Sequence, residues 1–211
     1  MIADMDFVHP IAAVIPGAQG RLLEVLIETT AELNLRTLAM LSGVSVAQAS
    51  RVLPELVELG LVERREVPPS SQFRLARTNV AVRALLELAA ARDIALTELG
   101  RTAKSLAVPP ASIIVFGSFA RGEAGRDSDL DVVFVRPAGV DEDDDSWGSS
   151  IEQWRSAARS LTGNPVEILE IGTDDAASRL DDRQQVWRDI LRDGRVVYGM
   201  SIEALRGVQV A

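Results

Sequence analysis

Apolar residues repeat along this chain with two different periods, one typical of helices and one typical of strands. Between residues 16 and 33 they fall at helical spacing, which predicts a first helix. Residues 35–41 fit a short second helix that ends at Ser42-Gly43, and Ser45 caps a third helix that ends at Gly60. Two alternating runs, LVERREV and FRLAR, flank a Pro-Pro-Ser-Ser turn and predict a β-hairpin. Three helices followed by a hairpin are typical of a winged helix-turn-helix.

The second half of the chain alternates strands and helices. Residues 79–106 predict a long Ala- and Leu-rich helical stretch with a break near Asp93, and two prolines follow it. Strand patterns then appear in SIIVF, DVVFV, PVEILEI and RVVYG, with helices around Trp147 and over residues 174–191. The expected fold is α/β, with a small mixed sheet flanked by helices. We expect a winged helix-turn-helix domain at 1–77, a connecting helical segment at 78–107, a second domain at 108–200 and a tail at 201–211.

Composition narrows the possible chemistry. The chain has no cysteine, which excludes disulfides, thiolate zinc sites and cysteine nucleophiles. No apolar run approaches the length of a membrane span, and the first residues lack the pattern of a secretory signal, so we expect a cytoplasmic protein without membrane contact. The formal net charge of −9 argues against a dedicated nucleic-acid coat.

The candidate chemistry lies in the segment IIVFGSFARGEAGRDSDLDVVFV. Asp129 and Asp131 are two apart on a predicted strand, so their side chains point to the same face. Gly117-Ser118 follows a buried strand and offers backbone N–H groups and a hydroxyl to a phosphate. Paired carboxylates are typical magnesium ligands, and such a site facing a phosphate-binding turn is suited to nucleotidyl transfer.

A two-metal scheme needs a third carboxylate on a neighbouring strand. The run PVEILEI offers Glu167 and Glu170, which are three apart and therefore face opposite ways on a regular strand. Alternation alone does not choose between them.

The run FGSFARGEAGRDSDLDVVF resembles the signature of the DNA polymerase β-like nucleotidyltransferase superfamily, and in particular the minimal nucleotidyltransferases. The resemblance covers roughly residues 108–200. It implies that Gly117 and Ser118 contact the phosphates of a nucleoside triphosphate and that Asp129 and Asp131 bind one or two Mg²⁺ ions. The third acid of the family often lies in a Val-Asp-Leu strand, which Val166-Glu167-Ile168 matches best. Glu167 is therefore the favoured third catalytic and metal-binding acid, with Glu170 in reserve.

Arg121 lies in the turn after Ser118. One interpretation is that it neutralises nucleotide phosphate charge. The alternative is a structural salt bridge to Asp127 or Glu123.

Residues 14–65 resemble winged-helix regulators of the ArsR and MarR type. In such modules the third helix enters the major groove and the wing contacts the DNA backbone. The candidates for base contact are Gln48, Ser50 and Arg51, and those for phosphate contact are Arg64, Arg65 and Arg74. Pro54 predicts a kink in the third helix. The alternative role of the module is dimerisation, including a homodimer, or docking on a partner protein.

Two hypotheses follow. The first is a magnesium-dependent nucleotidyltransferase that moves a nucleoside monophosphate from a nucleoside triphosphate to a hydroxyl acceptor. The second is a DNA-binding regulator or antitoxin-like protein in which the transferase fold only binds a ligand. Since minimal nucleotidyltransferases often pair with a separately encoded toxin, the resemblance also implies a protein partner.

Overall fold

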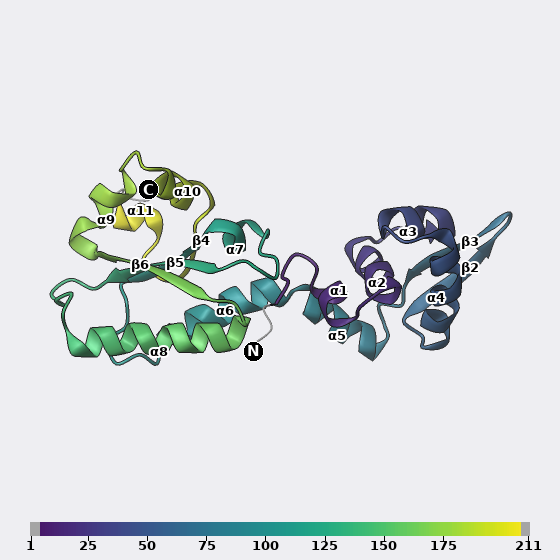
Figure 1. Cartoon of the computed structure of the whole chain (residues 1–211), viewed down its shortest axis with the longest axis horizontal. Helices are drawn as coiled ribbons and strands as arrows, with labels where there is room; N and C mark the ends of the chain where they lie inside the picture. The colour runs from purple at the N-terminus through teal and green to yellow at the C-terminus, as the bar shows by residue number, and fades with distance from the viewer. Residues whose placement is uncertain (1–4, 208–211) are drawn as a thin grey trace. The chain divides into compact units, whose positions relative to one another are not determined.

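The computed structural model describes residues 5–207, which divide into two compact units. One unit is His9–Ala91, and the other combines residues 5–8 with residues 92–207. The expected connecting segment at 78–107 spans the end of the first unit and the beginning of the second. Each unit has its own sheet and its own buried core, and each is described by itself below (Figure 1).

The first unit is a helical module with a small antiparallel sheet in the order β1-β3-β2. Its elements in chain order are α1 (Pro10–Val14), α2 (Ala18–Glu28), β1 (Leu33–Asn34), α3 (Leu35–Leu41), α4 (Val46–Glu58), β2 (Val62–Val67), β3 (Ser70–Leu75) and α5 (Val80–Ala89).

Local sequence explains where the two helices of the helix-turn-helix begin. Asn34 accepts a hydrogen bond from Thr37 N at 2.9 Å and so caps α3. Ser45 and Gln48 form a reciprocal capping box at the start of α4. The predicted third helix is confirmed, and it continues through Pro54 to Glu58. Leucines from α2, α3 and α4 then bury their side chains in one core together with Phe73 of the hairpin.

The second unit is built on a mixed four-stranded sheet in the order β6-β5-β4-β7. Its elements are α6 (Ala91–Ala103), β4 (Ser112–Phe116), α7 (Gly117–Arg121), β5 (Leu130–Arg136), α8 (Asp145–Thr162), β6 (Val166–Gly172), α9 (Thr173–Leu180), α10 (Gln185–Asp193), β7 (Arg195–Gly199) and α11 (Ile202–Leu205). The α/β class and the mixed sheet are confirmed.

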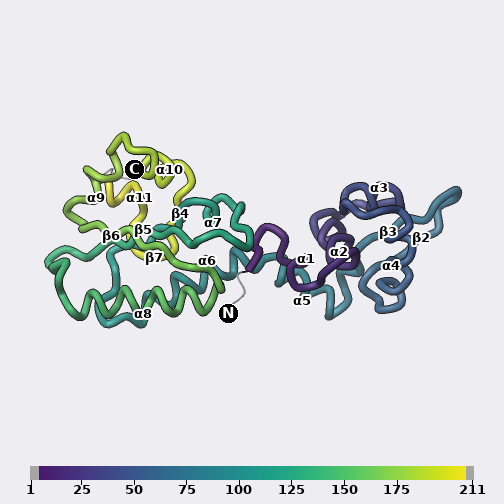
Figure 2. The backbone as a smooth tube through the Cα atoms, in the orientation of Figure 1, coloured from purple at the N-terminus to yellow at the C-terminus, as the bar shows by residue number. Residues whose placement is uncertain are grey.

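Helices cover both faces of this sheet (Figure 1). On one face the ring of Phe134 packs against Trp147 and Trp154 of α8, and Trp154 Nε1 donates to Leu99 O of α6 at 3.1 Å. On the other face a buried cluster joins β4 and β5 to α9, α10 and α11. β4 and β5 lie between the two helical layers, as the backbone trace also shows (Figure 2).

The structure adds short elements that the sequence pattern did not predict. These are α1, the two-residue strand β1, and α7, which begins directly at the Gly-Ser turn. The expected helix over 174–191 is two helices, α9 and α10, because the residues between them take turn conformations. The expected break near Asp93 occurs slightly earlier, at Ala90. Part of the expected tail is helix α11, and residues 208–211 lie outside the described residues.

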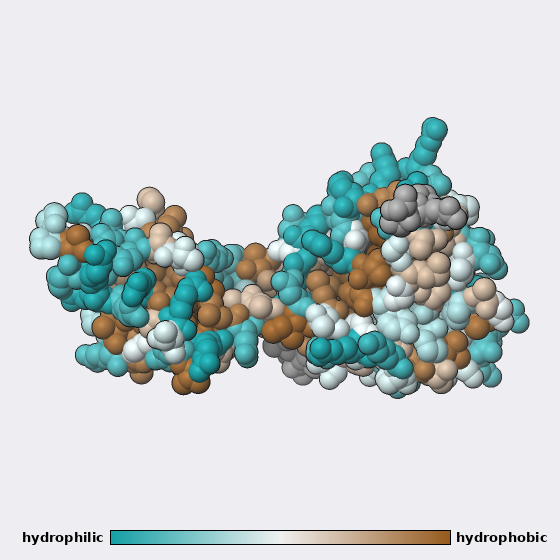
Figure 3. All heavy atoms as spheres, turned by 180° about the vertical axis from the view of Figure 1, so that it is seen from behind, coloured by the Kyte–Doolittle hydropathy of each residue, from teal (hydrophilic) through white to brown (hydrophobic). Residues whose placement is uncertain are grey.

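The described surface mixes hydrophilic and apolar side chains (Figure 3). The most exposed large apolar residues include Met40, Leu59 and Val80, at 71%, 65% and 73% of full exposure. Over residues 5–207, no helix has the length and apolarity that a bilayer crossing requires.

Candidate functional site

The candidate site begins where β4 ends. The strand SIIVF is buried over its first four residues, and the chain then turns at Gly117 into the single-turn helix α7. Gly117 has a φ of +67°, in the left-handed region that glycine adopts without strain. Ser118 is half-buried in the first turn of α7. Among the described residues, the Ser118 hydroxyl has no protein hydrogen-bond partner, so it remains available to a ligand.

Gly117 is also in direct contact with Asp131, one of the candidate metal ligands. A Cβ atom on residue 117 would overlap Asp131 Oδ2 and lie 3.2 Å from Asp131 Cγ. Phe116 and Asp131 are register partners on the antiparallel strands β4 and β5, which explains the close approach. The Gly-Ser turn and the Asp131 carboxylate therefore form one continuous surface.

Asp129 lies immediately before β5 and is exposed. Its two neighbours are held by the loop that precedes β6. Asn164 Nδ2 donates to Ser128 O at 2.8 Å, and Leu130 N donates to Pro165 O at 2.8 Å. The backbone around Asp129 is thus fixed from both sides, although its carboxylate remains open to solvent.

The strand register sets Glu167, the expected third acid, beside Asp131. β5 and β6 are parallel, and Asp131 and Glu167 are direct register partners. Side chains of register partners point to the same face of a sheet. Glu167 is exposed, as expected for a residue that would bind a ligand from solvent.

Glu170 has a different environment. Its Oε1 accepts hydrogen bonds from Trp147 Nε1 at 2.8 Å and from Arg136 Nε at 3.0 Å. Both contacts lie on the α8 side of the sheet, opposite to Glu167. Glu170 is therefore committed to packing, whereas Glu167 is the glutamate of β6 that shares a sheet face with Asp131.

The three acids repel one another electrostatically. The pKa of Asp131 is raised above its usual value of 3.8, mainly because the carboxyl is partly desolvated and also because Asp129 and Glu167 carry like charge. Arg121 acts in the opposite direction and lowers this pKa. A bound divalent cation would relieve this repulsion.

Within residues 5–207, no group of three or more His, Cys, Asp or Glu side chains is arranged closely enough to hold a metal ion. The donor set nevertheless fits a hard divalent cation, because Asp129, Asp131 and Glu167 supply only carboxylate oxygens and influence the same pKa.

Arg121 takes part in the salt bridge that was one of its two expected roles. Its Nε donates to Glu123 Oε2 at 2.7 Å, and its Nη1 lies 3.9 Å from Asp193 Oδ2. The guanidinium is only about a third exposed, and Asp127 is not among its ion-pair partners. The phosphate-binding role of Arg121 remains a prediction that would require exchange of these partners.

Two contacts that hold α7 in place were not found by sequence reasoning. Arg92 of α6 donates to Phe119 O at 2.7 Å and also to Ala120 O, so it caps the last turn of α7. Phe7 packs its ring against Phe119 at 4.9 Å and donates its N–H to Ala124 O. No local motif marks either residue, since both contacts span more than 25 residues of sequence.

The candidate DNA-contacting residues lie on the first unit. Gln48, Ser50 and Arg51 are exposed on α4, although the Gln48 side chain is engaged in the capping box. All three wing arginines are paired with acids. Arg64 contacts Glu66, and Arg65 and Arg74 contact Glu32 and Glu63.

Two known families match separate segments of the chain. Residues 96–185 match the family described as nucleotidyltransferase domain, and residues 20–66 match the IclR helix-turn-helix domain. The chain thus carries a nucleotidyltransferase domain behind a helix-turn-helix domain. The type matched for the latter is IclR, whereas the sequence resemblance pointed to ArsR and MarR regulators.

Comparison with curated proteins found no match. Among solved structures, one toxin-antitoxin complex with AMP-PNP shares 16% identity over 55% of this chain and 81% of that chain, with a TM-score of 0.35. A mutant of the toxin-antitoxin MntA-HpeT shares 12% identity over 53% and 80%, with a TM-score of 0.36. Similarity at this level identifies neither the fold nor the function of this chain.

Proposed function

We propose that this protein is a magnesium-dependent nucleotidyltransferase. The hydroxyl oxygen of an acceptor attacks the α-phosphorus of a nucleoside triphosphate, the bond to the bridging oxygen breaks, and pyrophosphate leaves. The observation that carries the proposal is the register of β5 and β6, which sets Asp131 opposite Glu167 while Asp131 touches the Gly-Ser turn.

Each residue has a distinct part in the proposed reaction. Gly117 and Ser118 bind the β and γ phosphates through backbone N–H groups and the hydroxyl. Asp129, Asp131 and Glu167 would hold one or two Mg²⁺ ions. When bound, the metal supplies charge neutralisation at the triphosphate and lowers the pKa of the acceptor hydroxyl. Glu167 is the best placed of the three to face the acceptor, since it is on the outer strand of the sheet and exposed.

The helix-turn-helix domain is proposed to bind DNA through the exposed face of α4. The paired wing arginines predict weak affinity, because each must exchange a glutamate for a phosphate.

The decisive experiment measures label transfer. The purified chain is incubated with magnesium, cell extract and each nucleoside triphosphate, labelled in parallel at the α or the γ phosphate. We expect an acceptor to gain the α label and not the γ label. Replacing both Asp129 and Asp131 with asparagine should abolish transfer, whereas Asp127→Asn, an exposed acid in the same loop, should retain it. Unchanged turnover in the double variant would refute the assignment.

A second function is favoured by the helix-turn-helix domain that is matched at residues 20–66. In this alternative the transferase fold binds a ligand without turnover, and the chain acts as a DNA-binding regulator or an antitoxin-like partner of another protein. It predicts salt-sensitive DNA binding, a co-purifying protein and no labelled product from any triphosphate. Light scattering on the same preparation measures its molar mass and would show whether the chain is a homodimer.

A further inference from the structure

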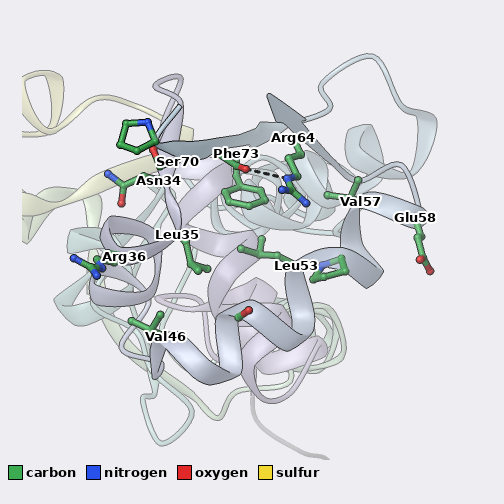
Figure 4. Close-up of a pocket in the computed structure, with 14 residues that line it drawn as sticks. Asn34, Leu35, Arg36, Val46, Leu53, Val57, Glu58, Arg64, Ser70 and Phe73 are labelled. Atoms are coloured by element: carbon green, nitrogen blue, oxygen red, sulfur yellow. Dashed lines mark hydrogen bonds between the residues drawn. The ribbon is translucent and has the colours of Figure 1, made fainter. Parts of the chain in front are cut away.

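The helix-turn-helix domain contains a cavity beside the candidate DNA-contacting residues. It has a volume of about 910 Å³ and lies between α3, α4 and the β2–β3 wing. Leu35, Leu53, Val57 and Phe73 contribute its apolar lining, with Leu35, Leu53 and Phe73 converging on its centre (Figure 4). Volumes of this size are typical of sites for drug-sized molecules.

Two residues that carry hydrogen-bond donors mark one end of the cavity. Asn34 and Arg36 lie at this end, and Glu58, the only acid in the lining, lies at the opposite end (Figure 4). The Asn34 side-chain oxygen is used to cap α3, which leaves its Nδ2 hydrogens for a ligand. Within residues 5–207, Arg36 has no ion-pair partner, in contrast to the three wing arginines.

Arg64 adds a second, partly committed cation. Its Nε donates to Ser71 Oγ at 3.0 Å, and its Nη2 contacts Glu66 at 2.6 Å, so the Nη1 donors remain. The lining therefore combines an apolar floor with free donors and one guanidinium that lacks a counterion. An anion with an apolar body complements both features, and a fully apolar ligand complements only the floor.

We propose that this cavity is a binding site for a small amphipathic anion, such as an apolar carboxylate or sulfonate. The anionic group binds Arg36 and Asn34 at one end, and the apolar body covers Leu53 and Phe73. The proposal does not depend on transferase activity, since every residue involved belongs to the first unit.

Occupation of this site would affect DNA contact, and this consequence rests on the proposed DNA-binding role. The cavity is lined by Ser50 of α4 and Arg64 of the wing, both candidate DNA contacts. A bound anion would add negative charge to the surface that approaches phosphate. Ligand and DNA should therefore compete.

The test uses two fluorescent probes that share a ring system. Anilinonaphthalene sulfonate carries an anionic group, and phenylnaphthylamine lacks it. We titrate each into the full-length chain and expect one sulfonate probe per chain, bound about tenfold more tightly than the neutral probe, because a hydrogen-bonded charge contributes roughly that factor.

Two variants locate the binding. Arg36→Gln should lower the affinity for the sulfonate by about tenfold and leave the neutral probe unchanged. Ser50→Trp places a ring into the cavity from an exposed helix position and should abolish binding of both probes. Arg83→Gln changes an exposed arginine of α5 outside the cavity and should change neither affinity.

The outcomes separate this proposal from the proposed function. Equal affinity for both probes, or a sulfonate affinity that Arg36→Gln does not change, overturns the anion site. If Ser50→Trp fails to fold by circular dichroism, the Arg36 comparison alone decides. A chain that meets the probe criteria and binds no DNA keeps the anion site and loses the DNA-binding part of the proposed function.

Discussion

Replacing Gly117 with alanine tests the link between the Gly-Ser turn and the metal-binding acids. Two costs add at this position. An L-residue at a φ of +67° loses about 1–2 kcal/mol relative to glycine. The new Cβ also overlaps Asp131 Oδ2, and moving that carboxylate off its rotamer costs about 0.5–1.5 kcal/mol. The sum is a loss of about 1.5–3.5 kcal/mol in the free energy of unfolding of the second unit.

A matched control isolates the second cost. Gly139 has a φ of +77°, and no atom lies within 4 Å of a Cβ built there. Gly139→Ala should therefore lose only the backbone part, about 1–2 kcal/mol. Circular dichroism during thermal and denaturant unfolding measures both variants, with about 2–4 °C in Tm expected per kcal/mol.

A double-mutant cycle completes the experiment. On an Asp131→Ala background the overlapping carboxylate is gone, so Gly117→Ala should cost only the backbone part. We expect a coupling energy of about 1 kcal/mol between the two positions. If Gly117→Ala costs no more than Gly139→Ala, and its cost is the same on both backgrounds, the claim that Gly117 and Asp131 form one surface is refuted.

The other predictions concern charged residues. Glu170→Ala should lower the free energy of unfolding by about 2–4 kcal/mol, because it removes the acceptor of a buried tryptophan N–H and the partner of a half-buried arginine. Glu167→Ala, at an exposed position, should change it by less than about 0.5 kcal/mol. Urea unfolding of both variants measures the difference. Because the pKa of Asp131 is raised in the folded state, its charged form destabilises the fold above that pKa, and this penalty disappears as the pH falls through it. Asp131→Asn should therefore raise Tm near pH 7 in chelator, and the gain in Tm should shrink towards pH 4. A gain in Tm that grows in acid would contradict a raised pKa. Glu32→Gln should release Arg65, while Arg74 keeps its ion pair with Glu63, and should tighten DNA binding several-fold at low salt. Glu28→Gln, at an exposed position of α2, should not, and fluorescence anisotropy with a labelled duplex measures both variants.

Local signals predicted the helices of the first unit well. Ser45 followed by Gln48 is a capping box, and its two hydrogen bonds form within four residues of sequence. Trp147 and Trp154 illustrate the same point, because a spacing of seven returns to the same helix face and both side chains are fully buried. In these cases residues close together in the sequence determine the structure.

The missed elements have causes elsewhere in the chain. β1 is only two residues long and exists because Leu33 and Asn34 pair with Phe73 and Gln72 of β3. α7 has one turn, and its last carbonyls are capped by Arg92, which is 27 residues away. A periodicity cannot develop in so few residues, so no local pattern could predict either element.

The candidate site was predicted in part. The sequence identified Asp129 and Asp131 by spacing and left Glu167 and Glu170 open, with the family resemblance favouring Glu167. The choice between them depends on the β5–β6 register and on the hydrogen bond from Trp147 to Glu170. The sequence of β6 alone reveals neither the register nor the hydrogen bond. Alternation assigns its residues to two faces, but it does not show which helix covers each face.

The contact between Glu170 and α8 has a consequence for mutational scanning. The two glutamates of β6 serve different ends, since Glu170 fixes the strand against its neighbours and Glu167 faces the proposed substrate side. A scan that scores only loss of activity would rank both as essential and give no reason to separate them. Measuring protein abundance alongside activity would split the pair: low abundance would follow loss of Glu170, and normal abundance without turnover would follow loss of Glu167. A strand of seven residues would then carry two selective pressures on its two faces.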